Sequence, residues 1–494
     1  MNKLKESLFV TKQIRQCERK ALDELCLTED DLMLRAAQSS FTTLKALYPD
    51  VESIAVFCGG GNNAGDGYVL ARLAHQEGFA VTVYALKAVD DLPRAANQAA
   101  IDAIACGVYC QHFEECMDCE ADLVVDALLG IGLQGEVREP YVQAIQVIND
   151  SDLPVLAIDI PSGLDADTGR VLGLCVKAHV TTTFIAEKVG LYLLDGPDFV
   201  GKVVCHSLQL EHLLTTLTPA AYKLSERSLQ GLIEPRRKNS HKGLYGHVLV
   251  IGGGEGMPGA PYLAALAALR VGAGMVSVAT RPEYARSVLP LLPEAMVYPI
   301  EQVDALKPLL SKATVCVIGP GLGESEWALS LFKAAVAVQL PLVVDASALR
   351  LLAEDPQHDD NWVLTPHPGE AAHLLTKTVA EIQLDRCQAA HQIHKQYGGC
   401  AVLKGVGTVV SAGLHDTSIC TAGNPGMASA GMGDVLSGVI GGLLAQGLSI
   451  NDAARLGVFL HAKAADDAVM TQGERGLLAS DLMPYLRRHI NQFC

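Results

Sequence analysis

Short runs of apolar, often β-branched residues recur along the whole chain, and most are followed by glycines and then by a stretch with helical periodicity. This alternation is typical of parallel sheets whose two faces are covered by helices. We therefore predict an α/β fold built from strand–turn–helix units. The expected strands are 54–58, 80–85, 123–126, 155–159 and 181–185 in the first half, and 247–251, 275–279, 315–318, 342–345, 362–365 and 401–404 in the second.

This rhythm is interrupted once, between residues 211 and 240, by a segment rich in Pro, Ser and Thr with a basic cluster. After it a new strand and glycine turn begin, HVLVIGGGEGMPGA, which parallel AVFCGGGNNAGDG in the first half. At roughly 100–200 residues per domain, a chain of 494 residues suits two large domains. We predict one domain over residues 1–215 and another over residues 225–494.

The composition excludes several classes of partner. A formal net charge of −17 repels nucleic acids and anionic membrane surfaces, although N–H groups at a helix N-terminus can still hold a nucleotide phosphate. Residues 1–25 are charged throughout, unlike a signal peptide, and no stretch has the roughly 18 apolar residues of a membrane helix. We expect a soluble, cytoplasmic protein with no nucleic-acid or membrane partner.

Most of the 14 cysteines lie in apolar runs, where they act as small buried hydrophobic residues. One group differs, because Cys106, Cys110, Cys116 and Cys119 lie close together with His112 among them. The second pair has the spacing of zinc ligands, but the two pairs are too near each other for an ordinary zinc ribbon. Chance clustering in a helix–strand connection is the favoured interpretation, and a structural metal is the alternative.

The most informative turn of the first half follows the strand at 54–58 and reads CGGGNNAGDGYVL. Its glycines allow positive φ and close approach of a ligand, and a loop that leads into a helix N-terminus is a natural phosphate site. It matches neither the dinucleotide fingerprint nor a Walker A motif. Instead it offers Asn62, Asn63 and Asp66 before a helix expected at 67–78. The alternative is that Asp66 caps this helix and the asparagines only fill turn positions.

Two more strands of this half end in acidic residues. Asp126 ends one strand before a second glycine turn, and Asp159 ends another before the sequence Ile-Pro-Ser-Gly. Ligands of open parallel sheets bind outside the carboxyl ends of the strands, so these side chains should meet at one edge. Oxygen atoms of Asn63, Asp126 and Ser162 would suit a hard cation, and a set with a single carboxylate favours a monovalent ion over Mg²⁺.

The motifs GGGNNAGDG, VDALLG and DIPSG, in this order and spacing, closely resemble those of the NAD(P)H-hydrate epimerase family over residues 10–215. The resemblance implies a Rossmann-like three-layer αβα domain, K⁺ bound by Asn63, Asp126 and Ser162, and Asp159 as the proton-transfer residue. Lys188 either supports Asp159 or is a solvated lysine at a strand end. The residues implied to contact the hydrated dinucleotide are Asn62, Asn63, Ala64, Gly65, Asp66, Gly130, Ile131, Gly132, Leu133, Gln134, Gly135, Glu136 and Asp159.

The chemistry that this resemblance implies is inversion at C6 of the hydrated nicotinamide ring. The ring nitrogen can expel the C6 hydroxyl to give an iminium ion, or the ring can open, and addition from the other face inverts the centre. A positioned carboxylate that moves a proton supports either route, and the sequence leaves both open.

The strongest motif of the second half is TAGNPGMASAGMGDVLSGVIGG, in which Gly431 and Gly433 precede Asp434 and an apolar helix. A glycine turn that opens a helix directs N–H groups at an anion, and Asp434 could then act as base for a hydroxyl that attacks a phosphate. The alternative is an N-cap aspartate with packing glycines. So many glycines destabilise a helix start, which favours a ligand site.

GMGD before an apolar helix resembles the ribokinase-like superfamily, and KGVGTVV, TPHPGE and GPGLG narrow the match to ADP-dependent NAD(P)H-hydrate dehydratases over residues 225–490. The resemblance implies a ribokinase-like αβα domain with Asp434 as catalytic base and with Mg²⁺ and ADP supplying the phosphoryl group. His367 either steers the substrate or is a packed histidine between prolines, and Lys404 either binds nucleotide or is a surface lysine. The residues implied to contact the hydrated dinucleotide are Ala260, Gly323, His367 and Asp434, and those implied to hold the adenine nucleotide are Lys404, Gly405, Val406, Gly407, Thr408 and Gly433.

Together the two resemblances predict a bifunctional repair enzyme, which interconverts the R and S forms of hydrated NADH and NADPH and dehydrates the S form while ADP becomes AMP and phosphate. The fused form favours ADP over ATP, and a homo-oligomer, with a tetramer favoured, is expected. The main alternative is a ribokinase-like small-molecule kinase with a regulatory first domain, which would release a phosphorylated product. A non-enzymatic nucleotide sensor is a third interpretation, and the presence of both Asp159 and Asp434 beside intact glycine turns argues against it.

Overall fold

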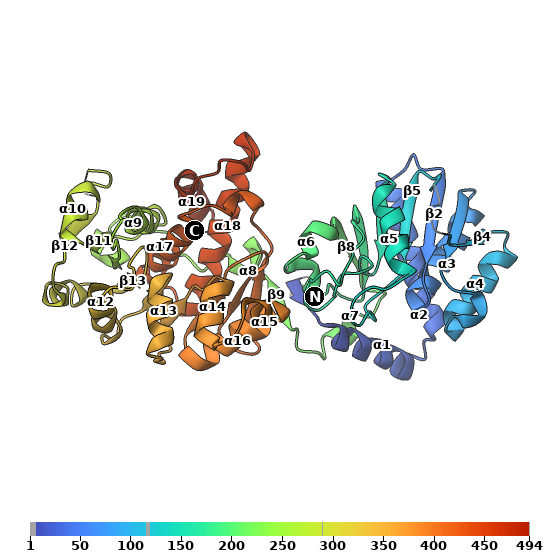
Figure 1. Cartoon of the computed structure of the whole chain (residues 1–494), viewed down its shortest axis with the longest axis horizontal. Helices are drawn as coiled ribbons and strands as arrows, with labels where there is room; N and C mark the ends of the chain where they lie inside the picture. The colour runs from blue at the N-terminus through green and yellow to red at the C-terminus, as the bar shows by residue number, and fades with distance from the viewer. Residues whose placement is uncertain (1–5, 115–118, 289, 494) are drawn as a thin grey trace. The chain divides into compact units, whose positions relative to one another are not determined.

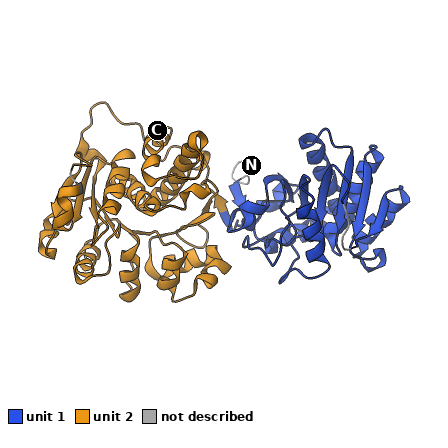
Figure 2. Cartoon of the chain, turned by 45° about the horizontal axis from the view of Figure 1, so that its top comes forward, with its two compact units in different colours: residues 1–221 blue, residues 222–494 orange. Residues whose placement is uncertain are grey.

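The computed structural model describes residues 6–114, 119–288 and 290–493, and the chain divides into two units, residues 1–221 and 222–494 (Figure 2). The division falls inside the segment 211–240, where the strand–helix rhythm of the sequence is interrupted. Each unit has its own apolar core, and the two units are therefore described separately.

The first unit contains a seven-stranded sheet of parallel neighbours in the order β4-β3-β2-β5-β6-β7-β8. The five predicted strands of this half are confirmed to within one residue, but the sequence pattern misses both edge strands, β4 and β8. Their residues are mostly exposed or half-buried, so they lack the continuous apolar run of a central strand. The strands are β1 (Ser7–Leu8), β2 (Ser53–Cys58), β3 (Ala80–Ala85), β4 (Tyr109–His112), β5 (Leu123–Ala127), β6 (Val155–Ile158), β7 (Val180–Phe184) and β8 (Lys202–His206).

Helices cover both faces of this sheet, with α2, α3 and α4 in one apolar core and α5 in another (Figure 1). Helix α3 begins at Asn62, five residues before the predicted start at 67, and its N-cap is Gly61. Asp66 therefore lies inside the first turns, and the interpretation of Asp66 as a helix cap is wrong. The helices are α1 (Thr11–Leu25), α2 (Glu29–Leu47), α3 (Asn62–Gln76), α4 (Arg94–Ala105), α5 (Tyr141–Asp150), α6 (Gly196–Phe199) and α7 (Glu211–Leu214), with short 3₁₀ turns at Val89–Asp91 and Val189–Tyr192.

The chain reverses its direction of growth at β2, because β3 and β4 lie to one side of β2 and the later strands to the other. At such a switch point the loops after the two central strands leave a crevice. Here those loops approach closely: Gly59 N donates to Ala127 O at 3.1 Å. A Cβ atom on Gly59 would lie 1.9 Å from Leu128 O, so only glycine fits where the two loops meet.

The second unit repeats this plan with the strand order β9-β18-β17-β16-β15-β14-β13-β10-β11-β12. Strand β17 is antiparallel to β16 and β18, and the other neighbours are parallel. The six predicted strands are confirmed, but alternation with helices does not predict the antiparallel pair or the short, exposed strands. The strands are β9 (Ala221–Lys223), β10 (His247–Ile251), β11 (Met275–Thr280), β12 (Met296–Pro299), β13 (Val315–Ile318), β14 (Leu342–Val344), β15 (Trp362–Leu364), β16 (Cys400–Leu403), β17 (Thr408–Ser411) and β18 (Thr417–Cys420).

In the second unit α9, α17, α18 and α19 pack on one face of the sheet, and α12, α13, α14 and α16 lie on the other (Figure 1). Glycines let α17 approach α9, because a Cβ on Gly438 would lie 2.1 Å from Ala264 O. The helices are α8 (Glu226–Leu229), α9 (Gly259–Arg270), α10 (Pro282–Val288), α11 (Lys307–Leu310), α12 (Glu326–Val336), α13 (Ser347–Glu354), α14 (Pro368–Leu375), α15 (Val379–Leu384), α16 (Arg386–Tyr397), α17 (Met432–Ala445), α18 (Ile450–Gln472) and α19 (Met483–Ile490), with 3₁₀ turns at Lys242–Tyr245, Val303–Ala305, Pro425–Met427 and Ala479–Leu482.

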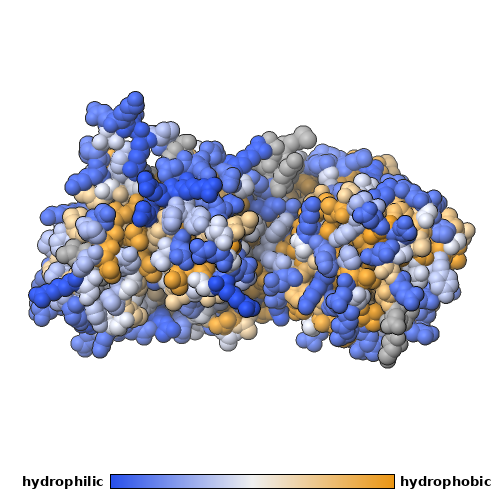
Figure 3. Space-filling view, turned by 90° about the horizontal axis from the view of Figure 1, so that it is seen from above, coloured by the Kyte–Doolittle hydropathy of each residue, from blue (hydrophilic) through white to orange (hydrophobic). Residues whose placement is uncertain are grey.

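Hydrophilic side chains cover much of the face drawn in Figure 3, with apolar patches between them. Among the described residues, no helix is both long and apolar enough to cross a bilayer. The possible zinc ligand Cys116 lies outside the described residues, and within them no group of three or more His, Cys, Asp or Glu side chains is arranged to hold a metal ion. Cys110 and Cys119 are half-buried, and burial raises the pKa of each thiol to about 11.

Candidate active sites

A buried ion pair lies at the carboxyl edge of the first sheet. Asp159 directly follows β6 and has a φ of 69°, a backbone conformation that few residues other than glycine adopt. Lys188 is fully buried, and its Nζ donates to Asp159 Oδ1 at 2.5 Å, to Thr183 Oγ1 at 2.8 Å and to Phe184 O at 3.0 Å. The interpretation of Lys188 as a solvated lysine is therefore wrong, and its ammonium is positioned to hold the Asp159 carboxylate.

The predicted cation ligands Asp126 and Ser162 are in direct contact. Ser162 Oγ donates to Asp126 Oδ1 at 2.6 Å, and Ser162 N donates to Oδ2 at 2.8 Å. Asn63 is buried beside Gly130, and its Nδ2 has no hydrogen-bond partner. Burial raises the pKa of Asp126 to about 6, although the hydrogen bonds from Ser162 act to lower it. The arrangement offers carboxylate, hydroxyl and amide oxygens at one sheet edge, which is a donor set of the kind that hard cations prefer.

Two further carboxyls lie near Asp159. Burial raises the pKa of Asp66 well above its ordinary value, and the charges of Asp159 and Glu18 raise it further. Glu18, on α1, has its pKa raised to about 6 by burial and by Asp159, with Lys188 acting in the opposite direction. Three carboxyls and one ammonium are thus grouped at this edge, where the sequence predicts only Asp66 and Asp159 as substrate contacts.

In the second unit the corresponding ion pair joins Asp345, directly after β14, to Lys404, directly after β16. Lys404 Nζ lies 2.9 Å from Asp345 Oδ1 and 3.6 Å from Glu370 Oε2. Asp345 is buried and also accepts from Thr365 Oγ1 at 2.7 Å and from Ser437 Oγ at 2.6 Å. Burial acts to raise the pKa of Asp345, but Lys404 and these hydrogen bonds outweigh it, so the pKa lies below its ordinary value.

Asp434 lies beside this pair in the first turn of α17. The N-cap of α17 is Gly431, with a φ of 90°, so the interpretation of Asp434 as an N-cap is wrong. A Cβ on neighbouring Gly433 would lie 3.4 Å from Lys404 Nζ, which shows how closely the turn approaches the ion pair. Burial and the charge of Asp345 raise the pKa of Asp434 to about 7, with Lys404 acting in the opposite direction. A carboxyl with this pKa suits general-base chemistry near neutral pH.

His367 is the N-cap of α14. Its Nδ1 accepts from Gly369 N at 2.9 Å and from Glu370 N at 3.2 Å, and its backbone N–H donates to Glu370 Oε2 at 2.7 Å. The side chain is 54% exposed, so the interpretation of His367 as a packed histidine is wrong. Because Nδ1 accepts, the ring proton lies on Nε2, which lies 3.5 Å from Glu370 Oε1.

The remaining predicted contacts lie on turns at the same edge of the second sheet. Ala260 is in the first turn of α9, and Gly323 donates its N–H to Ser347 Oγ at 2.9 Å in the loop after β13. Residues 404–407 form the turn between β16 and β17, which begins at Thr408, and buried Arg386 supports this turn by donating to Lys404 O at 3.1 Å. Lys404 itself is only 21% exposed, so the interpretation of Lys404 as a surface lysine is wrong.

Comparison with known proteins identifies the family. Over 485 residues, covering 98% of this chain and 99% of the relative, the chain is 48% identical to the bifunctional NAD(P)H-hydrate repair enzyme Nnr of Coxiella burnetii. The chain belongs to this family. It is also 44% identical to the repair enzyme of the same name from Escherichia coli, over 98% of this chain and 94% of that one.

Two family models match this chain, one in each half. The model described as YjeF-related protein N-terminus matches residues 29–190, and the model described as NAD(P)H-hydrate dehydratase matches residues 248–488. The structure of an ADP/ATP-dependent NAD(P)H-hydrate dehydratase from Bacillus subtilis, co-crystallized with ATP/Mg²⁺, is 30% identical with a TM-score of 0.51 and covers 55% of this chain and 98% of its own. A ribokinase-like protein from Enterococcus faecalis matches with the same score and identity, over 55% of this chain and 96% of its own. The predicted α/β fold class and the assignment as an enzyme are confirmed.

Sequence reasoning missed several residues that form these sites. Asp345, Thr365, Glu370 and Ser437 surround Lys404, and Glu18 lies near Asp159. Asp345 and Thr365 could have been found, because each ends a predicted strand as Asp159 does. Glu18 carries no such signal, since it lies on a helix that no motif connects to the sheet edge.

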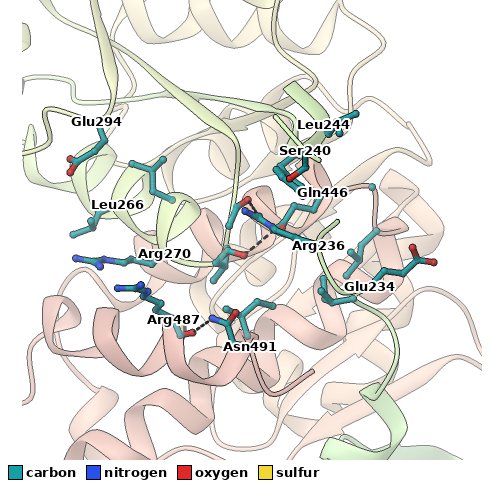
Figure 4. Close-up of a pocket in the computed structure, with 18 of the residues that line it drawn as sticks. Glu234, Arg236, Ser240, Leu244, Leu266, Arg270, Glu294, Gln446, Arg487 and Asn491 are labelled. Carbon is teal, nitrogen blue, oxygen red and sulfur yellow. Dashed lines mark hydrogen bonds between the residues drawn. The ribbon is translucent and has the colours of Figure 1, made fainter. Parts of the chain in front are cut away.

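A cavity of about 1170 Å³ in the second unit contains none of the predicted contacts (Figure 4). It lies where α9, α17 and α19 end. Arg236 donates there to Gly272 O and, at 3.0 Å, to Gln446 Oε1, while Arg270 and Arg487 line the wall. Cations are favoured at the negative ends of helix dipoles, which accounts for these arginines. The candidate active site is therefore the opposite, carboxyl edge of the sheet.

Proposed function

We propose that the chain repairs hydrated NADH and NADPH in two steps. The first unit interconverts the R and S forms at C6, and the second dehydrates the S form while ADP becomes AMP and phosphate. The observation that carries this proposal is that the chain has two sheets, and the proposed acid belongs to a lysine–aspartate pair at the edge of the first and lies beside such a pair at the edge of the second. A dehydratase that accepts only one epimer would leave the other epimer of a mixed pool unrepaired. An epimerase on the same chain converts that epimer into the one that is accepted.

In the second unit Asp434 takes the proton of the C6 hydroxyl as its oxygen attacks the terminal phosphorus of ADP, and AMP leaves. The raised pKa of Asp434, about 7, suits this base. The C6–O bond then breaks, phosphate takes the bonding pair, the ring nitrogen supplies electrons, and loss of a C5 proton restores the dihydronicotinamide ring. Mg²⁺, when bound, would offset the phosphate charge. The Lys404–Thr408 turn and the N–H groups at the start of α17, including Gly433, hold the nucleotide.

The hydrated dinucleotide contacts Ala260, Gly323, His367 and Asp434 in this unit. His367 contributes its exposed ring, with Nδ1 occupied by the helix cap and Nε2 lying 3.5 Å from Glu370 Oε1. ADP is proposed as the donor, and the Bacillus subtilis relative, described as ADP/ATP-dependent, supports an adenine nucleotide at this position.

In the first unit Asp159 moves the proton that inversion requires. The contact with Lys188 keeps its carboxylate in one position. The hydrated ring is held by Asn62–Asp66, in the first turns of α3, and by the Gly130–Glu136 loop after β5. We propose the iminium route, because expulsion and re-addition of water need only proton transfers of the kind that these carboxyls can make.

We further propose K⁺ as the cation of this unit, held by Asn63, Asp126 and Ser162. When bound, K⁺ would add positive charge near the dinucleotide phosphates. Replacing K⁺ by Tris should slow epimerisation about tenfold, in line with the usual loss when a metal site is disturbed, and leave dehydration of the S form unchanged. An epimerisation rate that is independent of K⁺ over 0–100 mM, about a physiological range of salt, would contradict this assignment.

The central experiment incubates the full chain with mixed hydrate epimers, ADP, Mg²⁺ and K⁺ and follows the return of dihydronicotinamide absorbance. The intact chain should restore the whole pool, and inorganic phosphate should appear in equal amount. D434N should restore none of it, whereas D159N should stop once the S form is consumed, apart from slow spontaneous inversion. A stable phosphorylated product without absorbance recovery would indicate a kinase instead.

The protein is also proposed to be cytoplasmic and to form a homo-oligomer, with a tetramer favoured. Leu244 and Leu291 are 60% and 64% exposed and line the same cavity, and exposed apolar side chains that gather in one place mark contacts between proteins. Light scattering of the purified chain measures the assembly directly, and a monomeric mass would contradict it.

A further inference from the structure

Helix α1 (Thr11–Leu25) carries a carboxyl that the roles above leave unused. The segment before the helix pairs with the chain beside Lys188: Phe9 N donates to Glu187 O at 3.0 Å, and Val189 N donates to Phe9 O at 3.1 Å. Phe9 is therefore paired with the segment that contains Lys188. This contact fixes where α1 begins.

Two contacts then hold the helix in position. Thr11 N and Oγ1 both donate to the Asp167 carboxylate, at 2.6 and 2.5 Å. One turn later Arg15 Nη2 donates to Ile131 O at 3.3 Å, in the loop proposed to contact the hydrated dinucleotide. Helix α1 thus extends from the Lys188 segment to the 130–136 loop. Glu18 follows Arg15 by three residues, so the two side chains lie on the same side of the helix.

Glu18 is half-buried, and within the described segments of the chain it has no hydrogen bond or ion pair. The charged groups that act on it are Asp159 and Lys188 from the sheet edge, Arg15 from its own helix, and Glu29 from α2. It acts in turn on Asp66 in α3. A half-buried carboxyl without a partner is less favourable than an exposed one, and the charge of Asp159, the residue proposed to transfer the proton, acts on it.

We propose that Glu18 is a second proton-transfer residue of the epimerase and that it works opposite Asp159. This inference rests on the proposed function of the first unit. Inversion at C6 needs an acid for the oxygen that leaves one face of the ring and a base for the water that enters the other face. Asp159 follows β6 and Glu18 lies on α1, so the two carboxyls come from two different elements of the unit.

The proton and electron changes balance within these two residues. The ring nitrogen forms a double bond to C6 while the C6–O bond breaks, and the leaving oxygen takes the Glu18 proton and departs as water. A water molecule then adds to C6 from the other face, the N–C6 π pair returns to nitrogen, and Asp159 accepts the proton of the incoming water. The opposite inversion starts from protonated Asp159 and ionised Glu18 and runs in reverse.

The environments of the two acids suit this division. Lys188 donates directly to Asp159, which matches a carboxylate, whereas the pKa of Glu18 is raised to about 6 by burial and Asp159. Pairs of acids whose surroundings differ in this way are typical of acid–base catalysis. Because both directions need one proton shared by the pair, both should slow as pH rises above about 6.

The test uses the full chain with mixed hydrate epimers, ADP, Mg²⁺ and K⁺, where recovery has a fast phase from the S form and a second phase limited by epimerisation. E18Q should leave the fast phase unchanged and slow the second by about 10²–10⁴, the usual contribution of general acid–base catalysis. E24Q, an exposed glutamate of the same helix, is the matched control and should change neither phase. An unchanged second phase in E18Q would overturn the inference.

A pH profile separates proton transfer from mere support of the helix. The wild-type second phase should fall on the alkaline side, and the residual rate of E18Q should lack that fall because glutamine holds no transferable proton. E18D should retain the fall with a smaller loss of rate. Equal losses in E18D and E18Q, or an alkaline fall that persists in E18Q, would show a purely structural role. A wild-type second phase no faster than spontaneous inversion would instead overturn the proposed epimerase function itself.

Discussion

The two sites share one architecture and differ in which aspartate the lysine contacts. Both lie where parallel strands end and glycine turns lead into helices, and both contain a buried aspartate–lysine contact. In the first unit Lys188 contacts Asp159, the acid proposed to react. In the second unit Lys404 contacts Asp345, and the proposed base, Asp434, stands beside that pair without a direct ion pair among the described residues.

This difference shows how one sheet-edge design can serve two kinds of proton chemistry. A carboxylate in direct contact with a buried ammonium is held in one position, which suits a residue that must face one side of a bound ring. A carboxyl that is largely buried and lies near a second carboxylate has its pKa raised, as for Asp434 at about 7, which suits removal of a hydroxyl proton near neutral pH. The charge of Asp345 thus adds to burial in raising the pKa of Asp434.

The strongest test of the comparison removes each lysine. K188M leaves the Asp159 carboxylate without its ammonium, and breaking a buried ion pair this way costs about 3–5 kcal/mol. We expect epimerisation to be lost and the unfolding of the first unit to move to lower temperature, with dehydration retained. K404M should destabilise the second unit less, by about 1–3 kcal/mol, because Asp345 keeps its donors Thr365 and Ser437.

Calorimetry of the full chain, with each transition assigned by the variant that moves it, measures both effects. The comparison is contradicted if the two lysine variants lower the free energy of unfolding equally, or if the first unit of K188M unfolds at the wild-type temperature.

Local sequence predicted the positions of both acids, because Asp159 follows an apolar strand, Asp434 opens an apolar helix, and both lie near glycines. The fold class and the central strands followed from the same alternation of apolar runs and helices. The sequence did not predict that α3 starts at Asn62, because the glycines and asparagines of that turn indicate a loop. In the structure Gly61 is the N-cap, and the helix begins directly after it. Local propensity was overridden there by the packing of the first turn, in which Asn63, Ala64 and Gly65 are buried.

Pairing between distant segments accounts for the rest. Glu18 reaches the first site only because Phe9 pairs with the segment at Glu187, and Lys404 meets Asp345 only because β14 and β16 are both neighbours of β15. No pattern of periodicity or spacing within one segment encodes such contacts. Long-range pairing of this kind needs the topology of the sheet, which the sequence pattern leaves open.

The pH dependence of the two activities should differ in direction. Dehydration of the S form needs ionised Asp434, so its rate should rise about tenfold per unit as pH increases toward 7 and level off above it. Epimerisation should fall above about pH 6, because it needs the proton shared by Glu18 and Asp159. Single-turnover rates of the two phases between pH 5 and 9, about the range over which such groups titrate, measure both, and parallel profiles would contradict the contrast.

The last contrast concerns the free energy of unfolding, which replacement of the two acids should change in opposite directions. The folded-state pKa of Asp434, about 7, lies above its ordinary value of 3.8, so the native state keeps a proton that the unfolded chain has released between these pH values. Stability from this group is therefore full at low pH and declines as pH rises from about 4 to about 7.

D434N removes that dependence. We expect it to stabilise the second unit by about 2 kcal/mol at pH 8, less than a full shift of this size implies because Asp434 is partly exposed, and to differ little from the wild type at pH 4. D159N should instead destabilise the first unit by roughly 3 kcal/mol, because buried Lys188 loses its counter-charge. Thermal unfolding at the two pH values distinguishes the cases, since a D434N chain no more stable than the wild type at pH 8 would mean that Asp434 is not held at an energetic cost. That result would remove the physical reason for treating the two acids as differently tuned.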